Sequence, residues 1–360
     1  MRVIIVYHTI TKYDAIGADI VQEYLCLKKH GHDVYIYAEK YDNEYRELVV
    51  DENAFLSMTN SQGAVVIFHH GGYWHRGSSL IGAVSSDIYL RYHNVTPPEF
   101  FKEYNPDFYD YALRGRKQTQ EFVESGKISW YITNSHYTAS ELKQYGVRDE
   151  QLAVVPPFHK LSEFEKINPD VNVLQRLLDG KINFLFVGRV APNKGHKHLI
   201  RTVEKFVHYY GYDVRVNIVG GTDPKLAIYY DELKDLISGA GLNDNIFFRN
   251  HVSSSELFSY YIGSHVFMLL SEHEGFCVPV LEAQYHHLPI IALNRGAVKE
   301  TMGDEQLVFD DVDYDVLASA AHVVCDSQSV RSYLAAKGRE NYNNYSMPNL
   351  EKKFIDSIHG

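Results

Sequence analysis

The chain has 360 residues, of which 45% are hydrophobic and 22% charged, a balance typical of a globular protein rather than a disordered or fibrous one. This length exceeds what one hydrophobic core usually supports, so we expect two domains with a cleft between them. The net charge of -11 argues against nucleic acid as a partner, because a phosphate backbone is held chiefly by an excess of Lys and Arg.

The cysteines and apolar runs indicate a cytoplasmic location. Cys26, Cys277 and Cys325 are far apart in the sequence and form no CxxC pair, so neither a disulfide framework nor a zinc knuckle is expected. The first apolar run is too short for a signal peptide, and no run approaches the 18 residues of a membrane-spanning helix.

The first half of the chain alternates short β-rich runs with helical patterns. Strands are predicted at 2–7, 33–37, 64–68, 87–92, 130–133 and 152–155, and a helix at 17–30. A polar stretch at 160–170 resembles a linker. A second series follows, with strands at 183–187, 214–219, 246–248, 266–270, 289–293 and 307–309, and a closing helical pattern at 345–359. Such alternation predicts two Rossmann-like parallel sheets in tandem, and sheets of this kind bind ligands at the carboxyl ends of their strands.

Two segments of the second half carry residues suited to an anionic ligand. Residues 188–195, GRVAPNKG, follow a buried strand, and Arg189 and Lys194 supply a planar fork and a point charge for two adjacent phosphates. Residues 271–283, SEHEGFCVPVLEA, run from another strand into a helix whose first amides would face an anion. Glu274 and Glu282 in this segment suit hydrogen bonds to sugar hydroxyls. The plainer alternatives are a solvated turn with two ordinary cations and a pair of surface carboxylates.

Together these segments resemble the retaining, family-four glycosyltransferases of the GT-B fold. EGFCVPVLEA matches that family's EGFxxPxxEA motif, and GRVAPNKG matches its GRxxxxKG loop. The resemblance implies an α/β protein with two Rossmann-like domains facing across a cleft. We assign residues 1–165 to an acceptor-side domain, 166–340 to a nucleotide-sugar donor domain, and 341–360 to a helix that crosses back to the first domain.

The resemblance also implies roles for individual residues. Glu274 would hold hydroxyls of the donor sugar and Glu282 those of the ribose, while Arg189 and Lys194 would clamp the diphosphate. The backbone of Gly275 and the amides of Phe276, Cys277 and Val278 would complete the phosphate cradle. The base would rest near Arg249, Asn250 and His251.

Histidines and one glycine of the first half complete the predicted site. His93 follows the strand at 87–92 and resembles the family's strand-end histidine facing the anomeric centre, so we predict that it is catalytic. His69 and His70 are further candidates for the same cleft. Many relatives carry a Gly-Gly loop after the first strand, where this chain has only Gly17 to approach the donor. His69, His70 and His75 lack a fourth ligand at suitable spacing, so no zinc site is predicted.

These observations predict a retaining, metal-independent hexosyltransferase without a cofactor, which takes a UDP or GDP sugar. A saccharide or lipid-linked saccharide in surface-glycan synthesis is the expected acceptor. Two alternatives are a non-hydrolysing nucleotide-sugar epimerase and a non-catalytic nucleotide-sugar-binding subunit. The aromatic and basic stretch at 97–116 fits either peripheral contact with the inner face of the membrane or, more simply, an amphipathic helix packed on the first sheet.

Overall fold

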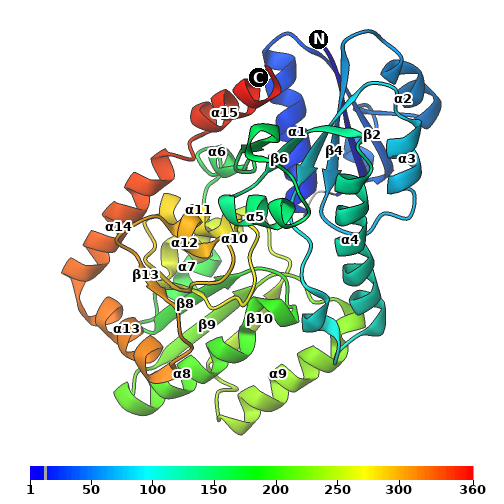
Figure 1. Ribbon diagram of the computed structural model, residues 1–360. Coiled ribbons are helices and arrows are strands. Elements are labelled where there is room, and N and C mark those ends of the chain that lie inside the picture. Colours follow the sequence, from blue (N-terminus) through cyan, green and yellow to red (C-terminus); the bar gives the residue numbers. More distant parts are fainter. Residues whose placement is uncertain (12–13, 360) are drawn as a thin grey trace. The chain divides into compact units, whose positions relative to one another are not determined.

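The computed structural model describes residues 1–11 and 14–359, and its elements are labelled in Figure 1. The chain divides into two compact units. Unit 1 contains Met1–Lys102, Pro106–His159 and Ser346–Gly360, and unit 2 contains Glu103–Asn105 and Lys160–Tyr345. The sequence analysis had placed the boundaries at 165/166 and 340/341.

Unit 1 is built on a seven-stranded sheet with the order β3-β2-β1-β4-β5-β6-β7, in which every pair of neighbours is parallel. Its strands are β1 (Arg2–Ile10), β2 (Asp33–Tyr41), β3 (Val49–Val50), β4 (Ala64–His70), β5 (Asp87–Tyr92), β6 (Ile128–Thr133) and β7 (Leu152–Val154). The two central strands are continuous apolar runs, as expected for strands covered on both faces.

The helices of unit 1 cover this sheet. α2 (Glu52–Thr59), α3 (Gly77–Ala83), α4 (Pro106–Glu124) and α5 (His136–Gln144) contribute to one core cluster, in which Phe122 of α4 packs with Phe68 of β4. The helix predicted within 97–116 therefore packs on the sheet. α15 (Met347–His359) lies beside α1 (Ala15–Lys29), where Lys29 and Glu351 form an ion pair of 2.6 Å (Figure 1).

Unit 2 is built on a six-stranded parallel sheet with the order β10-β9-β8-β11-β12-β13. The strands are β8 (Ile182–Val187), β9 (Val214–Val219), β10 (Ile246–Asn250), β11 (Val266–Leu269), β12 (Ile290–Leu293) and β13 (Leu307–Phe309). In both units the chain starts in the middle of the sheet, winds outward and then reverses, as in doubly wound nucleotide-binding sheets. The predicted tandem of parallel sheets is thus confirmed.

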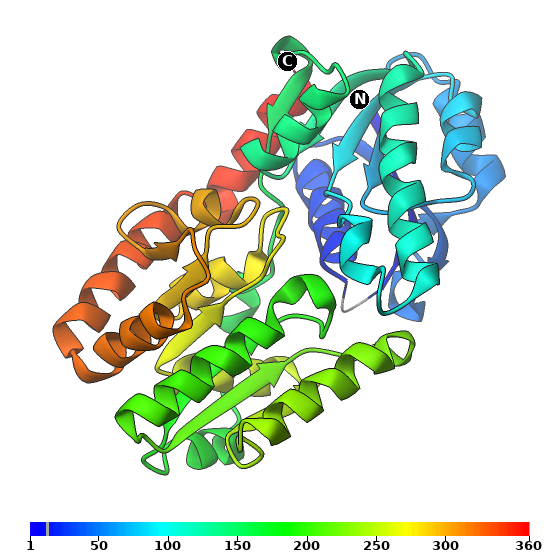
Figure 2. The ribbon, with the colours of Figure 1, turned by 60° about the horizontal axis from the view of Figure 1, so that its bottom comes forward.

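Helices cover both faces of the unit 2 sheet. On one face lie α8 (His196–Tyr210), α9 (Ala227–Gly239) and α13 (Tyr314–Asp326); α8 and α9 are prominent in Figure 2. On the other face lie α7 (Val171–Leu177), α10 (Ser254–Gly263), α11 (Val278–Tyr285) and α12 (Val298–Met302). α14 (Gln328–Asn343) packs against α11 and α13.

The stretch predicted to be a linker can be compared with the structure. The stretch interpreted as a linker contains the short helix α6 (Leu161–Phe164), and Leu161 and Phe164 are buried in a small cluster with Phe276 and Leu281. This part of the chain is therefore packed.

Among the described residues, no helix combines the length and apolar character that crossing a membrane requires.

Candidate functional site

The two motif loops of unit 2 meet at the point where the strand order reverses. The basic loop, residues 188–195, follows β8, and the acidic loop, residues 271–278, follows the neighbouring strand β11. The amide of Glu272 donates to Asn193 O at 2.9 Å, and Asn193 Nδ2 donates to His273 O at 3.4 Å. Ligands of open parallel sheets bind at such a reversal.

Lys194 and Glu274 form the ionic centre of this pair of loops. Lys194 Nζ donates to both carboxylate oxygens of Glu274, at 2.8 and 3.0 Å, and their side chains are 20% and 7% exposed. The backbone of Glu274 is also held in place, because the amide of Ala297 donates a hydrogen bond to the Glu274 carbonyl at 2.9 Å. The structure thus joins two candidate residues that are 80 positions apart in the sequence.

The start of α11 presents backbone donors beside this pair. Cys277 has a φ of 80°, a left-handed conformation that few residues other than glycine adopt, and Phe276 O accepts from Thr301 Oγ1 at 2.6 Å. Within residues 1–11 and 14–359, the amides of Phe276, Cys277 and Val278 donate to no acceptor. Three free amides at a helix N-terminus favour the binding of an anion.

Glu282 lies one turn into α11. Its Oε2 accepts a hydrogen bond of 2.5 Å from the hydroxyl of Tyr261, a buried residue of α10. Burial raises the pKa of Glu282, and the bond from Tyr261 acts in the opposite direction. The tyrosine therefore fixes the carboxylate and favours its ionised form.

Three other donor-site candidates lie at the same end of the sheet. Arg189 is exposed after β8 and makes no side-chain hydrogen bond or ion pair to a described residue. Asn250 has a φ of 51°, and its carbonyl accepts from Gly220 at 2.9 Å. The ring of His251 packs so closely on Gly221 that a Cβ there would lie 2.6 Å from His251 Nε2. Whether Arg189 reaches a diphosphate stays a prediction.

The histidine candidates of unit 1 belong to a buried chain of polar side chains. His93 Nε2 lies 2.8 Å from His69 Nδ1, and His69 Nε2 lies 3.0 Å from Glu23 Oε2. Beyond His93 the chain ends at the amide of Asn134, 3.3 Å from His93 Nδ1. The side chain of His93 is 5% exposed, whereas the side chains of His69 and Glu23 are fully buried.

One arginine forms ion pairs with two carboxylates beside these histidines. Arg91 lies 3.1 Å from Asp19 and 3.2 Å from Glu23, and all three side chains are fully buried. Burial raises the pKa of Asp19 to about 6 and that of Glu23 to about 7, and it lowers the pKa of His69 to about 3. The pKa of His93 is lowered well below its usual value, again chiefly by burial. A neutral His93 donates a hydrogen bond through one ring nitrogen and accepts one through the other.

Asp19, His69 and His93 also place one ligand atom each within 4.8 Å of one another, close enough to hold a metal ion. The arginine argues against a cation there, because Arg91 already neutralises Asp19 and would repel a metal ion. The ring nitrogens of His69 are also both engaged, one with His93 and one with Glu23. The site is therefore better described as a hydrogen-bonded cluster of histidines and ion pairs than as a metal centre.

The two remaining unit 1 candidates point elsewhere. Successive side chains of a strand face opposite sides of a sheet, so His70 turns away from His69 and contacts Thr119 of α4 at 2.8 Å. His70 therefore takes no part in the chain that joins His69 to His93. Gly17 lies in the first turn of α1, where a Cβ would come within 2.8 Å of Thr11 O. Its predicted contact with the donor stays a prediction.

Sequence reasoning missed the residues that position these candidates. Asp19 and Glu23 are four residues apart in the helix predicted at 17–30, so their shared face could have been recognised. Arg91 lies two residues before His93, in the strand that His93 follows. Nothing in the sequence pairs Tyr261 with Glu282, because that contact depends on how α10 packs against α11.

Residues 174–341 match the family model of the group 1 glycosyl transferases. They form a group 1 glycosyltransferase domain. Both motif loops, with Lys194, Glu274 and Glu282, lie within the matched residues.

Individual relatives agree with this assignment. The capsular polysaccharide biosynthesis glycosyltransferase CapM of Staphylococcus aureus is 27% identical over 188 residues, which are 51% of this chain and 48% of CapM. The D-inositol 3-phosphate glycosyltransferase of Streptomyces bingchenggensis is 30% identical over 189 residues, 50% of this chain and 41% of that protein. The matched part of the chain thus spans less than half the length of each of these two relatives.

Solved structures share the fold along the whole chain. The sucrose-phosphate synthase of Thermosynechococcus elongatus superposes with a TM-score of 0.78 at 15% identity, covering 100% of this chain and 98% of that protein. Anabaena Alr3699/HepE, crystallised with UDP and glucose, gives a TM-score of 0.76 at 14% identity, covering 100% and 99%. These similarities confirm the predicted GT-B fold.

Proposed function

We propose that this chain is a retaining, metal-independent hexosyltransferase that uses a nucleotide-diphosphate sugar. The observation that carries the proposal is the arrangement in unit 2, where the Lys194–Glu274 pair lies in loops that also present the three free amides of α11. Breaking a sugar–phosphate bond leaves negative charge on the departing diphosphate. A fixed ammonium group and helix-end amides are suited to stabilise that charge.

In this proposal each candidate residue has a separate task. Lys194 and Arg189 bind the diphosphate, and their two positive charges take the electrostatic role of a divalent ion. Glu274 accepts hydrogen bonds from hydroxyls of the sugar, and Glu282 accepts them from the ribose. His93 lines the acceptor side of the anomeric centre. The acceptor hydroxyl enters on the face from which the diphosphate leaves, and a phosphate oxygen takes its proton, so the anomeric configuration is kept.

The known proteins support a class of donor and acceptor. HepE was crystallised with UDP and glucose, and CapM is named for capsular polysaccharide biosynthesis. We therefore propose a UDP-hexose as donor and a saccharide or lipid-linked saccharide as acceptor, with the enzyme in the cytoplasm or peripheral on the inner face of the membrane. A GDP-hexose is the alternative donor.

The test compares two glutamates of the acidic loop. The full chain is incubated with UDP- and GDP-hexoses and a panel of saccharide acceptors in the presence of EDTA, and products are followed by mass spectrometry and by the anomeric proton coupling. Glu274→Ala is expected to lower turnover by about 100-fold or more, since removing one preorganised group at such a site typically costs that much. Glu272→Ala is the matched control, because Glu272 is two residues away, 43% exposed and paired with His198.

Several outcomes would reject the proposal. Equal activity of the Glu274→Ala and Glu272→Ala variants would remove Glu274 from the site. Conversion of the donor without any acceptor would indicate an epimerase, and nucleotide-sugar binding without turnover would indicate a binding subunit. Loss of activity in EDTA would reject metal independence alone.

A further inference from the structure

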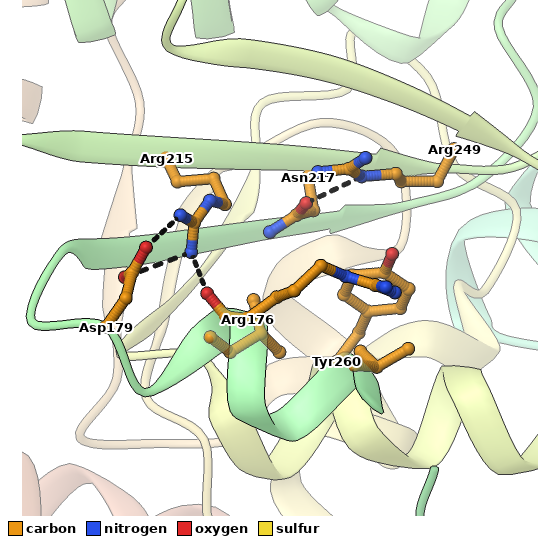
Figure 3. A pocket seen from close by; sticks show the side chains of 8 residues that line it. Arg176, Asp179, Arg215, Asn217, Arg249 and Tyr260 are labelled. Carbon is orange, nitrogen blue, oxygen red and sulfur yellow. Dashed lines mark hydrogen bonds and ion pairs between the residues drawn. The ribbon is translucent and has the colours of Figure 1, made fainter. Parts of the chain in front are cut away.

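A cavity of unit 2 that is not lined by the motif loops contains three arginines. It has a volume of about 250 Å³ and lies between the sheet and the helices α7 and α10 (Figure 3). Arg176 of α7, Arg215 of β9 and Arg249 of β10 line it, with Asp179 as the acidic residue of its lining. We call it the arginine pocket.

The carboxylate of the pocket is already engaged. Asp179 forms an ion pair with Arg215, which also donates to Arg176 O at 2.5 Å and to Asn183 Oδ1 at 3.2 Å. Arg215 thus joins the end of α7 to the sheet. Arg176 is exposed, and its guanidinium contacts no acidic group among the described residues. Two of the three positive charges are therefore unbalanced.

Arg249 is held inside the pocket by contacts that do not neutralise it. Its guanidinium lies 4.6 Å from the centre of the Phe247 ring, and Nε donates to Asn217 Oδ1 at 2.9 Å. Burial lowers the pKa of Arg249, Tyr260 acts in the opposite direction, and the nearby Arg176 and Arg215 lower the pKa further. An anion in the pocket would relieve this repulsion.

A buried amide points into the same space without a partner. Asn217 has no exposed surface, and its Nδ2 makes no hydrogen bond to a described residue. The bond from Arg249 fixes the other end of the amide as the oxygen, so the group that faces the cavity is a donor (Figure 3). Buried donors are nearly always satisfied in folded proteins, so this amide is available to an acceptor that enters the cavity.

We propose that the arginine pocket binds the phosphate group of a small soluble phosphate ester. Donors of Arg176, Arg249 and Asn217 come from three elements and line one cavity, and a tetrahedral oxyanion can accept hydrogen bonds from several donors at once. The hydroxyl of Tyr260 lines the same cavity and can add a fourth. The volume suits a phosphate with a short organic group and is below the range usual for larger ligands.

The arginine pocket lies apart from the two motif loops, although Arg249 directly precedes Asn250 and His251, near which the resemblance places the base. Arg176 and Asp179 precede β8, and Arg215 is the second residue of β9, so this side of the pocket lies at the amino ends of these strands. The motif loops 188–195 and 271–278 follow carboxyl ends. A ligand of the arginine pocket would therefore leave the motif loops free to bind a diphosphate.

The test measures binding of inorganic phosphate and of a sugar monophosphate by isothermal titration calorimetry, with chloride at equal ionic strength as the blank. The full chain and a Lys194→Ala variant are both expected to bind, because Lys194 is not in the pocket. Arg176→Gln is expected to weaken binding about tenfold or more, as for a lost charge-assisted hydrogen bond. Arg176 makes no side-chain bond to a described residue, so this variant should fold normally, which circular dichroism checks. Arg201→Gln, an exposed arginine of α8 paired with Glu204, is the matched control and should bind as the full chain does.

A second variant tests the sign of the charge. Asn217→Asp places a carboxylate between the arginines, so it should abolish phosphate binding and remove the rise in melting temperature that phosphate causes in the full chain.

Three results would overturn the proposal. The first is no saturable binding beyond the chloride blank. The second is equal affinity of Arg176→Gln and the full chain, and the third is loss of binding in Lys194→Ala with retention in Arg176→Gln, which would assign the phosphate to the motif loops. Vesicles of anionic phospholipid form a separate arm, because Arg176-dependent retention on vesicles without binding of soluble phosphate would indicate a lipid headgroup instead.

Discussion

Gly195 offers a direct test of how the two motif loops are held together. Its φ is 67°, and a Cβ at this position would lie 1.7 Å from Leu270 O and 2.5 Å from Leu270 C. Both atoms are backbone, so no side-chain rotation can relieve the overlap. Gly211, at the other end of the same helix, has a φ of 62° and no atom within 4 Å of the added Cβ. The two glycines therefore share the backbone conformation and differ in the contact.

Alanine at each position separates these two effects. The left-handed conformation alone costs an alanine about 1–2 kcal/mol, which is the loss expected for Gly211→Ala. Gly195→Ala should lose about 1–3 kcal/mol more, because the added methyl overpacks the junction of the loops. It should also weaken nucleotide binding, since the loop that carries Lys194 must move away from Glu274.

Urea unfolding monitored by far-UV circular dichroism measures the two losses. Tryptophan emission gives an independent record of unit 1, because both tryptophans, Trp74 and Trp130, belong to that unit. Equal stability of Gly195→Ala and Gly211→Ala would refute the reasoning, since it would mean that the loops do not need this close approach.

Two further predictions concern buried ionisable groups. The pKa of the fully buried His70 is lowered to about 3, so the unfolded chain takes up a proton below about pH 6.5 that the folded chain refuses, and stability falls on acidification in that window. His70→Gln should remove up to about 1.4 kcal/mol per pH unit of this loss in urea unfolding between pH 6.5 and 4.5, and an unchanged slope in this variant would contradict the role of His70. Tyr261→Phe removes the hydrogen bond to the Glu282 carboxylate and should lower stability by about 2 kcal/mol at pH 8, and by less at pH 5, where Glu282 gains protons. Tyr260→Phe in phosphate-free buffer is its control, and equal melting temperatures of the two variants at pH 8 would contradict this role of the bond.

The strands could be predicted from the sequence because each is a short apolar run followed by a helical pattern. The predicted 87–92, 214–219 and 307–309 coincide with β5, β9 and β13, and the others differ by a few residues at their ends. β3, with only Val49–Val50, was missed, because two residues at a sheet edge carry no periodicity. The meeting of Lys194 and Glu274 was also predictable in outline, since both follow strands of one parallel sheet.

Contacts between elements were not predictable in the same way. Arg176, Arg215 and Arg249 are ordinary cations in the sequence, and only the packing of α7 against β9 and β10 brings them together. The separation of His69 from His70 follows from strand alternation, which the sequence analysis did not apply. Both cases show that motifs locate strand ends well, whereas the partners of a buried charge depend on the packing of distant elements.

The proposed donor site depends on backbone approach more than on side-chain contacts. Two glycines with positive φ enclose the acidic loop, since a Cβ on Gly195 would meet Leu270 O at 1.7 Å and one on Gly296 would meet Glu274 O at 2.2 Å. Because these contacts are with backbone atoms, a rearrangement of side chains alone cannot change the spacing between the acidic loop and its neighbours. The ammonium of Lys194 and the carboxylate of Glu274 are thus fixed before a ligand arrives. A diphosphate that binds there would meet an ammonium group already in position, without reorganisation during the reaction.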